Sequence, residues 1–200
     1  MRLIGLTGGI ASGKSIVSKT MQDLGAAAIN TDAIGHSIIE PHKPAWDDLI
    51  EYFGPEILND DLTINRQKLG EIVFNAPEKL AKLNYITHPR IIAEMRSNIE
   101  FIKETNPDRV LVIEVPLLYE THMEKIFDEI WVVWVDRDTQ IKRLMARDGI
   151  GVEDAIRRIE SQMPLDEKAK RADVLIDNRH NIEETISIVT RNFNNILSQS

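Results

Sequence analysis

The sequence has no cysteine among its 200 residues. Without thiols the chain can form no disulfide, no thiolate metal site and no cysteine nucleophile, which is typical of proteins from a reducing compartment. It also has no long apolar segment, because the longest wholly apolar run, residues 130–135, falls far short of the ~20 residues that cross a bilayer. Glycines and a lysine interrupt the first apolar residues before a secretory signal could form. We therefore expect a cytoplasmic protein with no membrane partner.

Positive charge is also scarce. Lys and Arg number 24 against 32 Asp and Glu, so the formal net charge is −8. Proteins that bind nucleic acid non-specifically usually carry a basic excess on one face, so we expect a small-molecule partner and no nucleic acid. The hydrophobic fraction of 42% is enough for the core of one compact domain. We expect this domain to be a monomer or a weak homo-oligomer.

The most informative segment is GGIASGKS at residues 8–15, which matches the phosphate-binding pattern G-x-x-x-x-G-K-[ST] at every fixed position. In such a loop the backbone N–H groups surround a phosphate, the lysine reaches the outer phosphates, and the hydroxyl ligates Mg²⁺. The flanking residues fit this interpretation, since residues 2–7 are typical of a strand and residues 14–24 of a helix. Lys14 and Ser15 are therefore candidate nucleotide-binding residues.

Short apolar runs rich in β-branched residues predict strands that are covered on both faces. They lie at residues 3–6, 26–29, 110–115, 130–135 and 174–176. Helical spacing occurs at residues 14–24, 77–87, 89–105, 139–148, 152–162 and 182–197. The alternation of strand and helix predicts an α/β fold with three layers, α/β/α, around a five-stranded parallel sheet.

Two intervals are too long to be simple crossovers. Residues 32–106 begin with an acidic stretch punctuated by prolines, and we interpret them as a helical insertion. Residues 137–171 contain nine Lys or Arg against seven Asp or Glu, so basic charge is concentrated there in an acidic chain.

Asp32 follows the second predicted strand, so we expect it at the same sheet edge as the phosphate-binding loop. A carboxylate there can accept a proton from an attacking hydroxyl group, which is the general-base role in phosphoryl transfer to an alcohol. Alternatively, Thr31 or Asp32 caps a helix over residues 33–39. Residues 32–35 also match the D-x-x-G element of G domains, but no N-K-x-D element accompanies it, and we regard this match as accidental.

Further candidates lie in both long intervals. Arg143 and Arg147 share one face of the predicted helix 139–148, where they could bind a triphosphate or form an ordinary solvated face. His88 precedes a proline between two predicted helices and either contacts a substrate phosphate or hydroxyl group or only marks a helix end. Glu114 ends the third strand, where it could orient Mg²⁺ through water or cap the following turn.

Taken together, these segments resemble the dephospho-coenzyme A kinase family over nearly the whole chain. The resemblance rests on LTGGIASGKS at 6–15, NTDA at 30–33 with IEP at 39–41, THP at 87–89, PLLYE at 116–120, QIKRL at 140–144 with RD at 147–148, RIESQMP at 158–164 and ADVLIDN at 172–178. It implies ATP-dependent phosphorylation of the ribose 3′-hydroxyl of dephospho-coenzyme A, the last step of coenzyme A synthesis, with ATP and Mg²⁺ as cofactors.

The resemblance also implies an organisation and residue roles. A single domain would comprise a core (about 1–31, 107–136 and 172–200), a helical substrate region (about 32–106) and a small helical lid (about 137–171). Asp32, Lys14 and Arg147 would be catalytic, while Asp32, His88 and Leu117 would contact the acceptor and Ser15 would ligate Mg²⁺. ATP would be bound by Gly9, Ala11, Ser12, Gly13, Lys14, Ser15, Ile16, Arg143, Arg147 and, near the adenine, Asn178.

Two positions depart from the family pattern. Asn30 stands where the family usually has a second aspartate, so any metal role of that carboxylate is lost and the base assignment rests on Asp32. Ile16 replaces a hydroxyl residue, so we expect one side-chain contact to ATP to be missing. Two other functions remain as alternatives: a kinase of another small alcohol or nucleoside monophosphate, and a nucleotide-dependent switch.

Overall fold

The computed structural model describes residues 1–74 and 76–198, and the chain divides into two compact units. The core unit contains Met1–Asn30 and the chain from Ile102 onward, and the helical unit contains Thr31–Phe101. Within the described residues, no helix combines the length and the apolar character that a membrane span requires.

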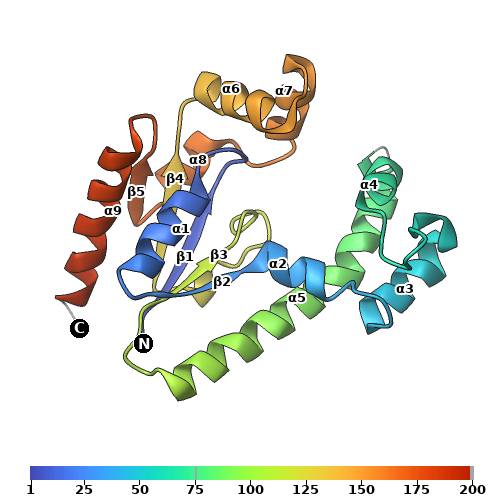
Figure 1. Cartoon of the computed structure of the whole chain (residues 1–200), viewed down its shortest axis with the longest axis horizontal. Coiled ribbons are helices and arrows are strands. Elements are labelled where there is room, and N and C mark those ends of the chain that lie inside the picture. Colours follow the sequence, from blue (N-terminus) through green and yellow to red (C-terminus); the bar gives the residue numbers. More distant parts are fainter. Residues whose placement is uncertain (75, 199–200) are drawn as a thin grey trace. The chain divides into compact units, whose positions relative to one another are not determined.

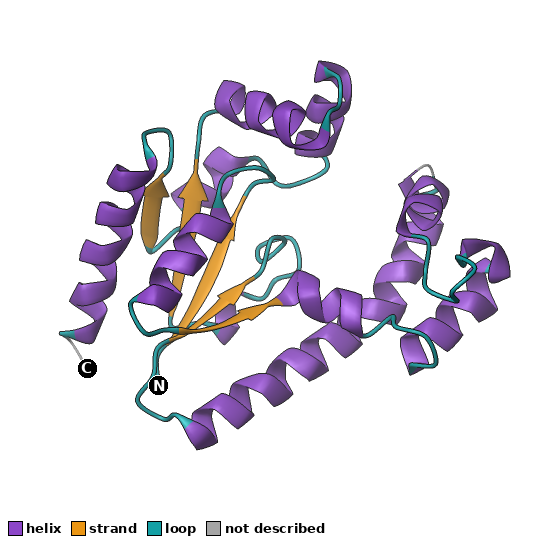
Figure 2. Cartoon of the chain, viewed as in Figure 1, coloured by secondary structure: helices purple, strands orange, loops and turns teal. Residues whose placement is uncertain are grey.

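The core unit is built on a five-stranded sheet in which all strands are parallel (Figure 2). The strands are β1 (Leu3–Gly8), β2 (Ala27–Asn30), β3 (Leu111–Glu114), β4 (Glu129–Trp134) and β5 (Val174–Asp177), in the spatial order β2-β3-β1-β4-β5. This arrangement confirms the predicted fold class. Because Glu114 pairs in register with both Leu6 and Asn30, β1, β2 and β3 end close to one edge of the sheet.

Helices cover one face of this sheet. The helices α1 (Lys14–Asp23) and α9 (Ile182–Leu197) pack against each other there (Figure 1). Their buried side chains, among them Met21 and Phe193, join alternate strand residues such as Leu6 in one apolar cluster. Each large apolar side chain removed from water in this way contributes roughly 1.5–3 kcal/mol to stability.

The other face of the sheet is covered by the chain that follows β3 and by α8 (Leu165–Lys170), which packs against β4. Gly5 of β1 faces this side, where an added Cβ would lie 2.8 Å from both Leu118 and Phe127. The close approach leaves no room for a side chain on Gly5. The sheet is thus covered on both faces, by α1 and α9 on one side and by α8 with the chain after β3 on the other.

Two helices of the core unit, α6 (Arg137–Asp148) and α7 (Val152–Glu160), follow β4 and pack against each other (Figure 1). Asp136 caps α6 by accepting a 2.8 Å hydrogen bond from the Thr139 backbone, so α6 begins two residues before the predicted start at Thr139. Gly149 ends α6 with a left-handed backbone (φ 66°) that is readily adopted only by glycine.

The helical unit contains α2 (Thr31–Ser37), α3 (Pro44–Phe53), the 3-10 turn η1 (Pro55–Ile57), α4 (Arg66–Phe74) and most of α5 (Pro77–Thr105). Its own apolar core is formed chiefly by Ala45, Leu49, Phe53, Ile57, Ile64, Leu69, Val73 and Ile86. The described part of this unit thus consists mainly of helices, and α2 begins two residues earlier than the predicted helix 33–39.

The predicted helix boundary at His88 and Pro89 was wrong. One continuous helix, α5, runs through this position with Pro89 in its interior. Proline removes one backbone N–H group from the helix, and side chains supply donors close to it. Thr87 donates to the Leu83 carbonyl at 2.9 Å and Arg90 to the Ile86 carbonyl at 2.6 Å. His88 therefore does not mark a helix end.

Candidate active site

The phosphate-binding loop connects the end of β1 to the start of α1 at the carboxyl edge of the sheet. Ala11 has a positive φ of 59°, and Gly13 has a φ of 96°. A Cβ on Gly13 would lie only 2.1 Å from Nδ2 of Asn178, so both the backbone conformation and the space require glycine at this position. The last glycine of the motif is therefore required by the backbone conformation and by the close approach of Asn178.

The loop presents hydrogen-bond donors of the kind that bind phosphate. Within residues 1–74 and 76–198, the backbone N–H groups of Ala11 and Gly13 donate to no protein acceptor, and the buried Ser12 hydroxyl has no hydrogen-bond partner. The first turn of α1 adds the positive end of a helix dipole. A polyphosphate fits this combination, because it supplies acceptors and negative charge together.

Lys14 and Ser15 form the first turn of α1. The Lys14 Nζ donates to the carbonyl oxygens of Gly8 (3.3 Å) and Gly9 (3.0 Å), so its ammonium group lies over the loop. The side chain of Ser15 is exposed, and that of Ile16 is partly buried. A positive charge and an accessible hydroxyl therefore flank the N–H donors of the loop.

Asn178, which directly follows β5, stabilises the loop through its side-chain amide. Its Nδ2 donates to the Ser12 carbonyl at 2.8 Å, and its Oδ1 accepts a 2.8 Å hydrogen bond from the hydroxyl of Thr185 in α9. Both side chains are buried, and the mutual hydrogen bonds satisfy their polar atoms. Asn178 belongs to the sequence motif at 172–178, whereas no sequence pattern indicates Thr185.

Arg143 and Arg147 of α6 have different partners. Arg143 donates through Nη2 to the Asn178 carbonyl at 3.0 Å, and its Nη1 would lie 3.9 Å from a Cβ on Gly13, so it lies beside the loop. Arg147 instead donates to both carboxylate oxygens of Asp148, at 2.7 and 3.2 Å. These hydrogen bonds raise the pKa of Arg147 and lower the pKa of Asp148, which also accepts from Arg158 at 2.8 Å.

Other predicted residues lie along the same sheet edge. Glu114 is partly buried in register with Asn30, and Leu117 is exposed in the turn that follows β3. The described residues contain no cluster of three His, Asp or Glu side chains that could enclose a metal ion. Magnesium retains several waters and is usually held through one or two protein groups and the phosphates of its nucleotide, so a single hydroxyl such as that of Ser15 fits its chemistry.

Asp32 and His88 belong to the helical unit. Asp32 is exposed in the first turn of α2; the helix begins at Thr31, so Asp32 is not its N-cap residue. His88 is partly buried in α5, and this desolvation lowers its pKa, so its imidazole is neutral at pH 7. A neutral histidine can both donate and accept a hydrogen bond, so it could contact a hydroxyl group in either direction.

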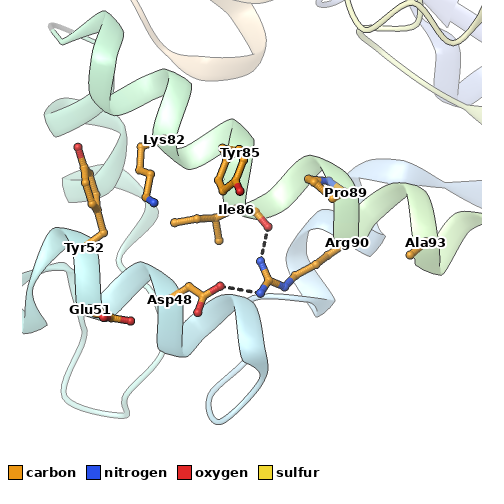
Figure 3. Close-up of a pocket in the computed structure, with 9 residues that line it drawn as sticks. All are labelled: Asp48, Glu51, Tyr52, Lys82, Tyr85, Ile86, Pro89, Arg90 and Ala93. Carbon is orange, nitrogen blue, oxygen red and sulfur yellow. Dashed lines mark hydrogen bonds and ion pairs between the residues drawn. The ribbon is translucent and has the colours of Figure 1, made fainter.

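A groove of about 810 Å³ opens between α3 and α5 of the helical unit (Figure 3). In it the Lys82 ammonium lies 5.3 Å from the ring centroids of both Tyr52 and Tyr85, while Arg90 donates to Asp48 at 2.6 Å. The groove residues of α5 follow helical spacing and form one face: Lys82, Tyr85, Ile86, Pro89, Arg90 and Ala93. His88 falls outside this stripe, so it is not part of the groove.

Two glutamines, Gln140 and Gln162, also contact the loop, and no sequence pattern indicated a role for either. Gln140 is buried although it lies on a helix with a strongly polar composition, and Gln162 follows α7. A signal for Gln140 exists in retrospect, because it lies four residues before the buried Leu144 and so shares the inward face of α6.

Comparisons with known proteins point to a single family. The family model described as dephospho-CoA kinase matches residues 2–184. A dephospho-CoA kinase of Carboxydothermus hydrogenoformans is 50% identical over 183 residues, covering 92% of this chain and 88% of that protein. One from Symbiobacterium thermophilum is 47% identical over 186 residues, with 92% and 77% covered. The solved structure of the Campylobacter jejuni dephospho-CoA kinase superimposes with a TM-score of 0.74 at 29% identity over 98% of each chain.

Because these matches extend over nearly all of the sequence and include the phosphate-binding loop, the chain belongs to the dephospho-CoA kinase family.

Proposed function

We propose that this protein transfers the γ-phosphoryl group of ATP to the ribose 3′-hydroxyl of dephospho-coenzyme A, which completes coenzyme A synthesis. The observation that carries the proposal is the family match over residues 2–184 together with a phosphate-binding loop that has the required donors. Mass spectrometry of dephospho-coenzyme A incubated with the protein and MgATP tests it. One added phosphoryl group is expected, and an unchanged acceptor would contradict the proposal.

A panel of acceptors separates this function from its alternatives. A kinase of another small alcohol or nucleoside monophosphate would phosphorylate that acceptor in preference to dephospho-coenzyme A. A nucleotide-dependent switch would hydrolyse ATP slowly and yield no phosphorylated small molecule. The family match favours dephospho-coenzyme A over both.

Nucleotide binding is assigned to the loop and its neighbours. Backbone N–H groups over Gly9 and residues 11–16 would surround the phosphates, and the Lys14 ammonium would neutralise their charge. Asn178 would lie near the adenine while its side chain braces Ser12. Ser15 would ligate Mg²⁺, which supplies charge neutralisation on the β- and γ-phosphates when it is bound.

Asp32 is assigned as the general base. Its carboxylate would accept the proton of the 3′-hydroxyl as that oxygen forms a bond to the γ-phosphorus, while the bond to the β-phosphate oxygen breaks and ADP leaves. The chain supports this role, because Asp32 lies two residues after the end of β2, whose last residue is in register with Glu114 at the carboxyl edge of the sheet. His88 and Leu117 would contact the acceptor.

The helices within residues 137–171 are assigned as a lid. Phosphoryl transfer spreads negative charge over the γ-phosphoryl oxygens, and arginines stabilise that charge. Arg143 is well suited because it already lies beside Gly13 of the loop, and Arg147 would contribute from the last turn of the same helix. We further propose a cytoplasmic location and a monomer or weak homo-oligomer.

A further inference from the structure

Both backbone polar groups of one loop residue, Ile10, are bound by glutamine side chains. The Ile10 N–H donates to Oε1 of Gln162 at 3.0 Å, and the Ile10 carbonyl accepts from Nε2 of Gln140 at 2.8 Å. The amide orientations follow from chemistry alone, because an N–H group requires an oxygen and a carbonyl requires an N–H donor. Gln162 is thus the acceptor for the N–H group of Ile10, and Gln140 is the donor to its carbonyl group.

The two glutamines lie at the two ends of the α6–α7 helix pair. Gln140 is in the first turn of α6, and Gln162 follows the last residue of α7 by two positions. Both ends of the segment that carries Arg143 and Arg147 are therefore hydrogen-bonded to a single residue of the phosphate-binding loop. The contact is a close one, since a Cβ on the neighbouring Gly9 would lie 2.4 Å from Nε2 of Gln140.

We propose that Gln140 and Gln162 are positioning residues that fix the Ile10 segment for nucleotide binding and couple the loop to the α6–α7 pair. Neither side chain needs to touch the reacting atoms. By holding both polar groups of Ile10, they keep the following N–H groups of Ala11 and Gly13 available to phosphate oxygens. A rotation of this segment would redirect those donors and disturb the base of α6 at the same time. The inference rests on the proposed ATP-dependent function and extends it.

The opposite polarities allow a matched test with Gln140→Glu and Gln162→Glu. Each variant adds one negative charge beside Ile10 and keeps the size of the side chain. Gln162→Glu retains an oxygen acceptor for the Ile10 N–H, whereas Gln140→Glu replaces the donor with an oxygen that faces the Ile10 carbonyl. Because the partly buried Ile10 carbonyl loses its donor only in Gln140→Glu, we expect this variant to weaken ATP binding about tenfold more than Gln162→Glu.

Direct ATP titration without acceptor is the readout, with thermal unfolding of the nucleotide-free variants as a check on folding. Two results would overturn the proposal. One is equal weakening of ATP binding by the two glutamate variants, and the other is a wild-type affinity for ATP in both. If Gln140→Glu does not fold, the neutral variants Gln140→Met and Gln162→Met replace the pair, and each should raise the dissociation constant for ATP severalfold; no change in either would also refute the proposal.

Steady-state kinetics separates positioning from general damage. In Gln140→Glu, or in the two methionine variants that replace the pair, the KM for ATP should rise while the KM for dephospho-coenzyme A stays near its wild-type value. A parallel rise of both KM values would contradict the positioning role. Because ATP titration needs no acceptor, its outcome is independent of the acceptor's identity. If the wild-type protein binds ATP but leaves dephospho-coenzyme A unmodified, the proposed function is refuted, whereas the positioning role of Gln140 and Gln162 is not.

Discussion

Lys168 forms an ion pair with Glu120 at 2.8 Å although the Lys168 side chain is completely buried. Its Nζ also donates to the Pro116 carbonyl at 2.8 Å, and Glu120 accepts from the Met163 backbone at 2.9 Å. Burial lowers the pKa of Lys168, while the hydrogen bond and charge of Glu120 oppose this shift. The ion pair therefore connects α8, which contains Lys168, to the chain that follows β3, which contains Glu120.

Removing only the lysine should be more harmful than removing both charges. Lys168→Met leaves the Glu120 carboxylate without its cation, and we expect the free energy of unfolding to fall by about 2–4 kcal/mol. The double variant Lys168→Met/Glu120→Gln keeps an oxygen acceptor for Met163 and removes the uncompensated charge, so it should recover part of this loss. Urea denaturation of Lys168→Met, Glu120→Gln and the double variant, each compared with the wild-type protein, measures the coupling; strict additivity would contradict a direct interaction.

Tyr119 should give a pH dependence of stability at the alkaline end. Burial, followed by the charges of Asp173 and Glu124, raises its pKa to about 12 from the usual 10. Above pH 10 an unfolded tyrosine loses its proton while the native one keeps it, so the native state binds more protons and the free energy of unfolding falls as the pH rises from 10 to 12. The loss should be on the order of 1–2 kcal/mol.

Tyr119→Phe is the control for this effect. Its unfolding free energy should depend less steeply on pH between 10 and 12, although it also loses the 3.0 Å hydrogen bond from Tyr119 to the Arg171 carbonyl. When tyrosinate absorbance is followed against pH, the native wild-type protein should show a late deprotonation from Tyr119, and this transition should be absent in Tyr119→Phe. Identical pH profiles for wild type and Tyr119→Phe would show that another group causes the alkaline loss.

Asp32→Asn tests the proposed base. The amide cannot accept the proton of the 3′-hydroxyl, so kcat should fall by about 10²–10⁴-fold. The dissociation constant for ATP should change little, because the proposed phosphate contacts are the Lys14 ammonium and the N–H groups of the loop, which this substitution leaves in place. Steady-state turnover with saturating ATP and acceptor measures the effect. Near-normal turnover would remove Asp32 from this role.

The phosphate-binding loop and the sheet could be predicted from the sequence because their signals are local. The motif at residues 8–15 requires particular residue types, and buried parallel strands appear as short continuous apolar runs. The path of α5 through Pro89 could not be predicted in this way. A proline usually ends a helix, and its toleration here is accompanied by a side-chain hydrogen bond from Arg90, which is visible only in three dimensions.

The partners of the site residues were equally hidden. Arg143 and Arg147 have the same residue type and share one helix face, yet Arg143 contacts Asn178 and Arg147 pairs with Asp148. The contact between Gln140 and Ile10 joins residues 130 positions apart in the sequence. No periodicity or composition encodes such long-range pairs; they depend on how parallel strands bring their carboxyl ends together.

Arg147→Ala tests whether this exposed arginine serves catalysis or only its ion pair. If Arg147 stabilises the transferring phosphoryl group, kcat should fall by about 10–10³-fold with ATP and acceptor both saturating. Stability should change by less than ~1 kcal/mol, because exposed ion pairs contribute little and Asp148 keeps its contact with Arg158. The control is Arg157→Ala, which removes another exposed arginine of the same helix pair together with its ion pair to Asp154. Equal turnover by the two variants would mean that Arg147 has only a surface role.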